Sequence, residues 1–125
     1  MDDLSSLSVL VIDDSYVNRQ LMKSILDTKI KEITEAGDGI EALEILESGN
    51  LPDMIILDLM MPVMDGIETL MRIRKLGLDI PIIVITADIE GSNRIKCMEL
   101  GVAGFINKPI YGAQVVKMIN GVMKK

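Results

Sequence analysis

The chain has no histidine, no tryptophan, one cysteine, one phenylalanine and two tyrosines in 125 residues. The absence of histidine excludes Ser-His-Asp and Cys-His catalysis, histidine-ligated metals and a phosphohistidine intermediate. The single cysteine, Cys97, excludes a disulfide within the chain, and we expect it to be a small buried apolar residue in a reducing, cytoplasmic setting. Any chemistry must therefore come from carboxylates, hydroxyls and lysines.

Long hydrophobic runs are also missing. No apolar stretch is long enough to cross a membrane, and the first residues do not resemble a signal peptide, so we expect no membrane insertion. Nineteen acidic and thirteen basic residues give a formal net charge of −6. This balance argues against direct binding to nucleic acid, because phosphate contacts need clustered lysine and arginine. With 49% hydrophobic residues, the chain can build one core, and we expect a single domain over residues 1–125.

Short apolar runs alternate with helical patterns along the chain. We expect strands at 8–12, 31–36, 54–57, 82–85 and 104–106. A helix is predicted after each strand, among them 65–76, where Asp65 and Gly66 shape the helix start, and 92–100. This alternation predicts an α/β fold, a doubly wound five-stranded parallel sheet with helices on both faces.

The first predicted helix is amphipathic. Ser15 is placed to cap its start. Its apolar residues are spaced to share one face, namely Val17, Leu21, Met22, Ile25 and Leu26.

Polar side chains follow the ends of four predicted strands. Asp13 and Asp14 follow the first, Asp58 the third, Thr86 the fourth and Lys108 the fifth. Because the carboxyl ends of parallel strands share one edge, where ligands bind, we expect these side chains to form one pocket. Two unit charges about 4 Å apart repel by about 4 kcal/mol at an effective dielectric of about 20. Either one carboxylate keeps its proton or a hard cation such as Mg²⁺ or Mn²⁺ is bound, and we favour the cation.

Four motifs around these residues occur in a characteristic order. They are Val-Leu-Val-Ile-Asp13-Asp14-Ser, Ile-Ile-Leu-Asp58-Leu-Met-Met-Pro62-Val-Met-Asp65-Gly66, Ile-Val-Ile-Thr86-Ala87 and Phe105-Ile-Asn-Lys108-Pro109. Over nearly its whole length the chain resembles the receiver domain of two-component response regulators, most closely the stand-alone, CheY-like receivers. The resemblance implies a flavodoxin-like fold with strand order 2-1-3-4-5.

The resemblance also implies phosphoryl transfer to Asp58. The donor would be a sensor histidine kinase or a phosphotransfer protein. Asp14, Asp58 and the backbone carbonyl of Met60 would bind Mg²⁺ directly, and Asp13 would act mostly through a bound water. The protein would be a phosphorylation-dependent switch in a phosphorelay, catalysing only its own phosphorylation and dephosphorylation, and would not be an enzyme with another substrate.

A switching mechanism is implied by the same resemblance. Thr86 and Lys108 would bind the new phosphoryl group, and movement of Thr86 would let Phe105 turn inward. This would reshape the surface of the fourth helix, fifth strand and fifth helix, where a separate output protein would bind. Chemotaxis is the expected pathway for a lone receiver, and we expect a monomer that can dimerise on phosphorylation. Met60 and Asp88 would tune the lifetime of the phosphorylated state, and we expect slow dephosphorylation unless Asp88 compensates for apolar Met60.

Each of these residues also has an ordinary structural interpretation. Asp13 and Asp14 could cap a helix, Thr86 could be a strand residue, Lys108 an exposed lysine and Phe105 a core residue. Their combined placement favours the functional interpretation.

Three alternatives to a stand-alone switch use the same sequence features. A haloacid dehalogenase-like phosphatase uses similar groups, but it has its nucleophile after the first strand in an Asp-x-Asp pattern, whereas Met60 lies two residues after Asp58. A structural interaction domain with a defunct site is disfavoured because every expected site residue is present. The chain could also be the receiver fragment of a larger regulator or hybrid kinase.

Overall fold

The computed structural model describes residues 4–61, 64–87 and 91–124. The predicted residues Pro62 and Asp88 lie outside the described part. The strands are β1 (Ser8–Ile12), β2 (Glu32–Ala36), β3 (Met54–Asp58), β4 (Ile82–Thr86) and β5 (Gly104–Asn107). The helices are α1 (Tyr16–Leu26), α2 (Gly39–Glu47), α3 (Gly66–Lys75), α4 (Gly91–Glu99) and α5 (Gly112–Met123). The predicted alternation of strands and helices is confirmed.

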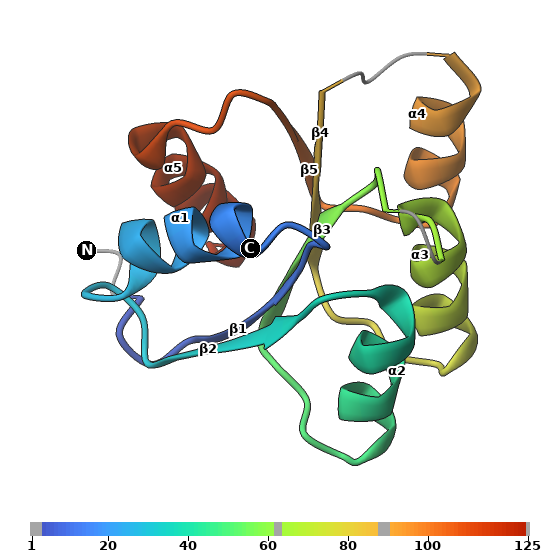
Figure 1. Cartoon of the computed structure of the whole chain (residues 1–125), viewed down its shortest axis with the longest axis horizontal. Helices are drawn as coiled ribbons and strands as arrows, with labels where there is room; N and C mark the ends of the chain where they lie inside the picture. Colours follow the sequence, from blue (N-terminus) through green and yellow to red (C-terminus); the bar gives the residue numbers. More distant parts are fainter. Residues whose placement is uncertain (1–3, 62–63, 88–90, 125) are drawn as a thin grey trace.

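The strands form one parallel sheet in the order β2-β1-β3-β4-β5. Helices α1 and α5 cover one face, and α2, α3 and α4 cover the other (Figure 1). The predicted doubly wound fold and its strand order are therefore confirmed. The order reverses between β1 and β3, which is the position where such folds place their ligand crevice.

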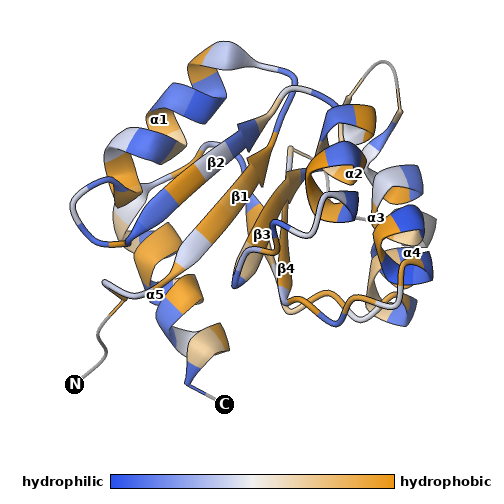
Figure 2. Cartoon of the chain, turned by 90° about the horizontal axis from the view of Figure 1, so that it is seen from below, coloured by the Kyte–Doolittle hydropathy of each residue, from blue (hydrophilic) through white to orange (hydrophobic). Residues whose placement is uncertain are grey.

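Two apolar clusters fill the space between the sheet and its helices. Every residue of β3 and of β4 is buried, as expected for strands covered on both faces. Residues that alternate along each strand enter opposite clusters, so that Ile56 packs on the α1 and α5 side and Leu57 on the other. Figure 2 shows the apolar strands β1, β3 and β4 between the helices. Cys97 is buried as expected, and this burial raises the pKa of its thiol.

Helix α1 differs from its predicted packing. Met22 and Leu26 are buried, but Val17 is 72% and Leu21 41% exposed, so only part of the predicted apolar face is covered. Residues 17, 21 and 25 form one row along the helix, and this row is covered only at its far end, where Ile25 packs on the core. No helix in the described ranges is long and apolar enough to span a bilayer.

Candidate functional site

The strand ends bring the predicted polar residues to one edge of the sheet. Asp58 and Thr86 are the last residues of β3 and β4, Asp13 and Asp14 follow β1, and Lys108 follows β5. Asp13, Asp58 and Thr86 are buried, with 5%, 3% and 1% of their surface exposed. One carboxylate oxygen each from Asp13, Asp14 and Asp58 lies within 4.8 Å of the others. The strand ends therefore bring the three aspartates and Lys108 close together, as expected for parallel strands.

Both carboxylate oxygens of Asp58 have partners. The Lys108 ammonium nitrogen Nζ lies 3.2 Å from Oδ2, and the backbone N–H of Met60 donates to Oδ1 over 3.1 Å. Lys108 is held at this edge because its backbone N–H donates to the carbonyl oxygen of Thr86 (2.9 Å). The Met60 side chain is 65% exposed. The pair of Asp58 and Lys108 therefore crosses from β3 to the end of β5, beside buried Thr86.

Asp13 takes up a proton at a higher pH than an ordinary aspartate does. Its pKa is raised from 3.8 to about 6, chiefly by burial. The hydrogen bond from the Ser15 backbone N–H to its Oδ1 (2.9 Å) opposes this, the negative charge of Asp58 raises the pKa further, and Lys108 lowers it. One positive lysine thus leaves the pocket with excess negative charge.

The donors in this pocket suit a hard divalent cation. Among the described residues, the three aspartates are the one group of acidic side chains that could hold a metal ion. All of their donor atoms are carboxylate oxygens, and Mg²⁺ prefers one or two carboxylates together with water and phosphoryl oxygens. The carbonyl of Met60 follows β3 at the same edge of the sheet. The residues present therefore fit Mg²⁺.

The two helices that follow the acidic residues are each capped by a side chain at their start. Ser15 caps α1, as predicted, by accepting a hydrogen bond from the Asn18 backbone N–H (3.1 Å). Asp65 caps α3 in the same way, through the Glu68 backbone N–H (2.8 Å). Next to it, a Cβ on Gly66 would meet the Cα of Leu59 and lie 2.7 Å from the carbonyl oxygen of Asp58. The chain therefore needs glycine where α3 starts behind Asp58.

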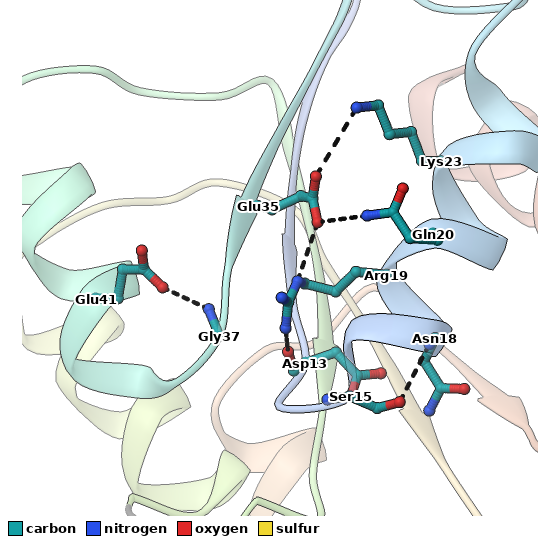
Figure 3. Close-up of polar contacts among 9 residues, drawn as sticks. All are labelled: Asp13, Ser15, Asn18, Arg19, Gln20, Lys23, Glu35, Gly37 and Glu41. Atoms are coloured by element: carbon teal, nitrogen blue, oxygen red, sulfur yellow. Dashed lines mark hydrogen bonds and ion pairs between the residues drawn. The ribbon is translucent and has the colours of Figure 1, made fainter.

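Arg19 and Glu35 were missed by sequence reasoning. The Arg19 guanidinium donates from Nη1 to the Asp13 carbonyl oxygen (2.6 Å) and from Nε to Glu35 Oε1 (3.0 Å). Figure 3 shows this contact joining α1, β2 and the end of β1. An arginine in a helix and a glutamate in the next strand carry no motif, so nothing in the sequence pairs them.

Phe105 lies half-buried on β5, beside Val84 of β4. It packs against the cluster on the α2, α3 and α4 side of the sheet. The Arg94 guanidinium of α4 lies 4.8 Å from the centroid of its ring, within the range of a cation–π contact. The aromatic side chain thus connects β5 to the fourth helix.

Comparison with known proteins identifies relatives over most of the chain. The model of the response regulator receiver domain matches residues 9–120. The sensor histidine kinase RcsC of Escherichia coli is 34% identical over 88% of this chain and 12% of its own length. The response regulator MprA of Mycobacterium ulcerans is 32% identical over 96% of this chain and 51% of its own length. The chain therefore spans about a tenth to a half of these relatives.

Solved structures agree with this assignment. The CheX–CheY–BeF3–Mg²⁺ complex from Borrelia burgdorferi matches with a TM-score of 0.88 at 29% identity, over 97% of this chain and 92% of that chain. The likeness therefore covers the arrangement of the sheet and helices over almost the whole chain.

Proposed function

Because the chain belongs to the response regulator receiver domain family, we propose that it is a phosphorylation-controlled switch with Asp58 as the phosphoryl acceptor. The observation that carries this proposal is the surroundings of Asp58. Its carboxylate is 3% exposed, lies 3.2 Å from the Lys108 ammonium and shares the pocket with two further aspartates. A buried carboxylate of this kind at a strand end is poised to react with a ligand bound at the edge of the sheet.

Phosphoryl transfer places specific demands on this pocket. An oxygen of Asp58 attacks the phosphorus of a phosphohistidine, the P–N bond breaks, and an acyl phosphate forms on Asp58. Mg²⁺, when bound, neutralises charge on the phosphoryl oxygens. Asp14, Asp58 and the backbone carbonyl of Met60 would bind this cation directly, and Asp13 would act mostly through a bound water. Lys108 moves from the carboxylate to a phosphoryl oxygen, and the Thr86 hydroxyl binds another, so the chain's contribution is positioning and charge.

Phosphorylation would be detected directly with acetyl phosphate and Mg²⁺. Mass spectrometry should find a labile phosphoryl adduct on Asp58, and the adduct should be lost in Asp58→Asn. Asp79→Asn is a matched control, because Asp79 is exposed on the loop before β4. An adduct that persists in Asp58→Asn would overturn the proposal. Turnover of a free phosphoester by the wild type would instead favour the phosphatase alternative. The presence of Met60 two residues after Asp58, where such a phosphatase has a second aspartate, argues against that alternative.

The switch would act through Thr86 and Phe105. Thr86 is buried at the end of β4, and half-buried Phe105 can repack when the hydroxyl moves. The surface formed by α4, β5 and α5 carries the exposed apolar residues Ile95 and Met98, which are 60% and 58% exposed, and these support binding of a separate output protein there. Three further properties are predictions: a role in chemotaxis, a location in the cytoplasm, and a monomer that dimerises on phosphorylation.

The chain's single phenylalanine makes this switch measurable. Incorporated fluorophenylalanine reports on position 105 alone by ¹⁹F NMR. We expect acetyl phosphate with Mg²⁺ to shift this resonance in the wild type and to leave it unmoved in Asp58→Asn. A resonance that stays in place while mass spectrometry shows full phosphorylation would contradict a switch through Phe105.

The lifetime of the phosphorylated state should depend on Met60. Its side chain is apolar, 65% exposed and attached two residues after Asp58, so it organises an attacking water poorly. Met60→Asn should accelerate phosphate loss, and an unchanged or slower rate would count against this role. Asp88, the second predicted tuning residue, lies outside the described ranges.

A further inference from the structure

We propose that Arg19 is a positioning residue for the divalent cation, because it fixes the peptide group that joins Asp13 to Asp14. This inference rests on the proposed function, which places the cation between these two aspartates and Asp58. Arg19 itself touches neither the cation nor the phosphoryl group in this assignment. It acts on the backbone that carries the ligands.

The geometry is a two-pronged contact across three elements (Figure 3). Arg19 extends from α1, its Nη1 donates to the carbonyl oxygen of Asp13 (2.6 Å), and its Nε donates to Oε1 of Glu35 on β2 (3.0 Å). The side chains of Arg19 and Glu35 are 16% and 29% exposed. A planar guanidinium suits this task, since its N–H groups have fixed directions and bind two acceptors at once.

Glu35 is itself held in place. The Gln20 side-chain amide donates to its Oε1 (3.2 Å), and the Lys23 ammonium lies 3.9 Å from its Oε2. Its strand is anchored by the parallel pairing of β1 with β2, in which Val11 lies beside Glu35. The guanidinium is therefore oriented by a glutamate that is itself held by α1 and by its place in the sheet.

These contacts leave Asp13 little freedom. Its backbone N–H donates to the Ala36 carbonyl (3.1 Å), its own carbonyl accepts from Arg19, and its Oδ1 accepts from the Ser15 N–H. The peptide group before Asp13 is thus held by β2, and the peptide group that leads to Asp14 is held by Arg19 of α1. Asp14 is exposed, so the direction of its side chain depends chiefly on this backbone. Holding ligands in place before the ion arrives lowers the entropy lost on binding.

The choice of acceptor also matters for charge. Arg19 binds a backbone carbonyl and leaves the pocket carboxylates available, whereas a cation on those carboxylates would compete with Mg²⁺. Glu35 lies 3.0 Å from the guanidinium and offsets its charge locally. The arrangement therefore orders the loop without neutralising the metal ligands.

The test is the dissociation constant for Mg²⁺ alone, measured by isothermal titration calorimetry at pH 8. Arg19→Gln should weaken Mg²⁺ binding about tenfold, at the low end of the loss seen when partners that orient metal ligands are removed. The matched control is Arg72→Gln, which removes the same charge from an exposed ion pair with Glu68 on α3. Arg72→Gln should bind Mg²⁺ within about twofold of the wild type. Both variants lose one positive charge, so a difference in affinity between them does not come from net charge.

Two further measurements keep the outcomes distinct. Circular dichroism establishes that each variant is folded, and Arg19→Lys provides a milder change if Arg19→Gln does not fold. An ammonium cannot reproduce the planar fork, so Arg19→Lys should bind Mg²⁺ more weakly than the wild type. Equal affinity of the folded Arg19 variants and Arg72→Gln would overturn the positioning role while leaving the proposed function intact. Failure of the wild type to bind Mg²⁺ would overturn both.

Discussion

Replacing Asp13 by asparagine should stabilise the metal-free protein at alkaline pH. Burial raises the pKa of this carboxyl from 3.8 to about 6. Above pH 6 Asp13 is charged in both the native and the unfolded state, and the native state holds this charge less favourably. A shift of about two pKa units corresponds to about 3 kcal/mol of lost stability. Asparagine carries no charge and keeps an oxygen that can accept the hydrogen bond from Ser15.

The sign of the pH dependence follows from the raised pKa. As the pH falls from 6 towards 3.8, the native state takes up a proton before the unfolded state does, so the wild type becomes more stable relative to Asp13→Asn. The stabilisation of the protonated form is complete at low pH and is lost as the pH rises through about 6. The advantage of Asp13→Asn should therefore be about 3 kcal/mol at pH 8 and about half of that at pH 5.

Urea unfolding followed by circular dichroism in the presence of EDTA measures this difference. The exposed residue Asp79 supplies a control, since Asp79→Asn should change stability little at either pH. An advantage of Asp13→Asn that is equal at pH 8 and pH 5, or a loss of stability at pH 8, would refute the reasoning. Mg²⁺ should reduce this advantage at pH 8, because ion at a hundred times its dissociation constant adds about 2.7 kcal/mol to the protein that binds it and Asp13→Asn binds it less well.

Three further changes test the remaining contacts. Lys108→Met should lower the metal-free stability by about 2 kcal/mol, because it leaves the buried carboxylate of Asp58 without its cation. It should also increase the rise in Tm on adding Mg²⁺, and an unchanged rise would contradict a competition between ammonium and metal. Gly66→Ala should lower the free energy of unfolding in urea by about 3 kcal/mol, because the new Cβ would meet backbone atoms. The control Gly77→Ala, at φ +79° with open space around it, should lower it by about 1 kcal/mol. Equal losses would argue against close packing behind Asp58. Arg94→Ala removes a cation–π contact of about 1 kcal/mol. It should move the ¹⁹F resonance of the single phenylalanine towards the position seen in the phosphorylated protein, while Arg94→Lys should not. A resonance that does not move in Arg94→Ala would show that the contact does not restrain the ring.

The fold could be predicted from the sequence because its signals are local and mutually consistent. Apolar β-branched runs at β3 and β4 identify buried strands, and the helical patterns between them force parallel crossovers. The packing of α1 could not be predicted in the same way. Its apolar spacing includes Val17 and Leu21, and only the length of helix that the core covers decides that both are exposed.

Sequence alone determined which side chains meet in the pocket. Asp13, Asp14, Asp58, Thr86 and Lys108 stand at the ends of parallel strands, and those ends share an edge in any fold of this class. The support around them was beyond prediction, because the contact of Arg19 with Glu35 joins residues 16 positions apart and depends on how α1 lies across β1 and β2.

Tertiary structure also decided the ionisation of the pocket. Asp13 and Asp14 are adjacent and chemically identical, yet Asp13 is buried, with a pKa of about 6, while Asp14 is exposed. Neighbouring residues at a strand end point in different directions, and the packing around each sets how much water reaches its carboxylate. The identity of the site residues is thus written in the sequence, whereas their charge and orientation arise only from the folded chain.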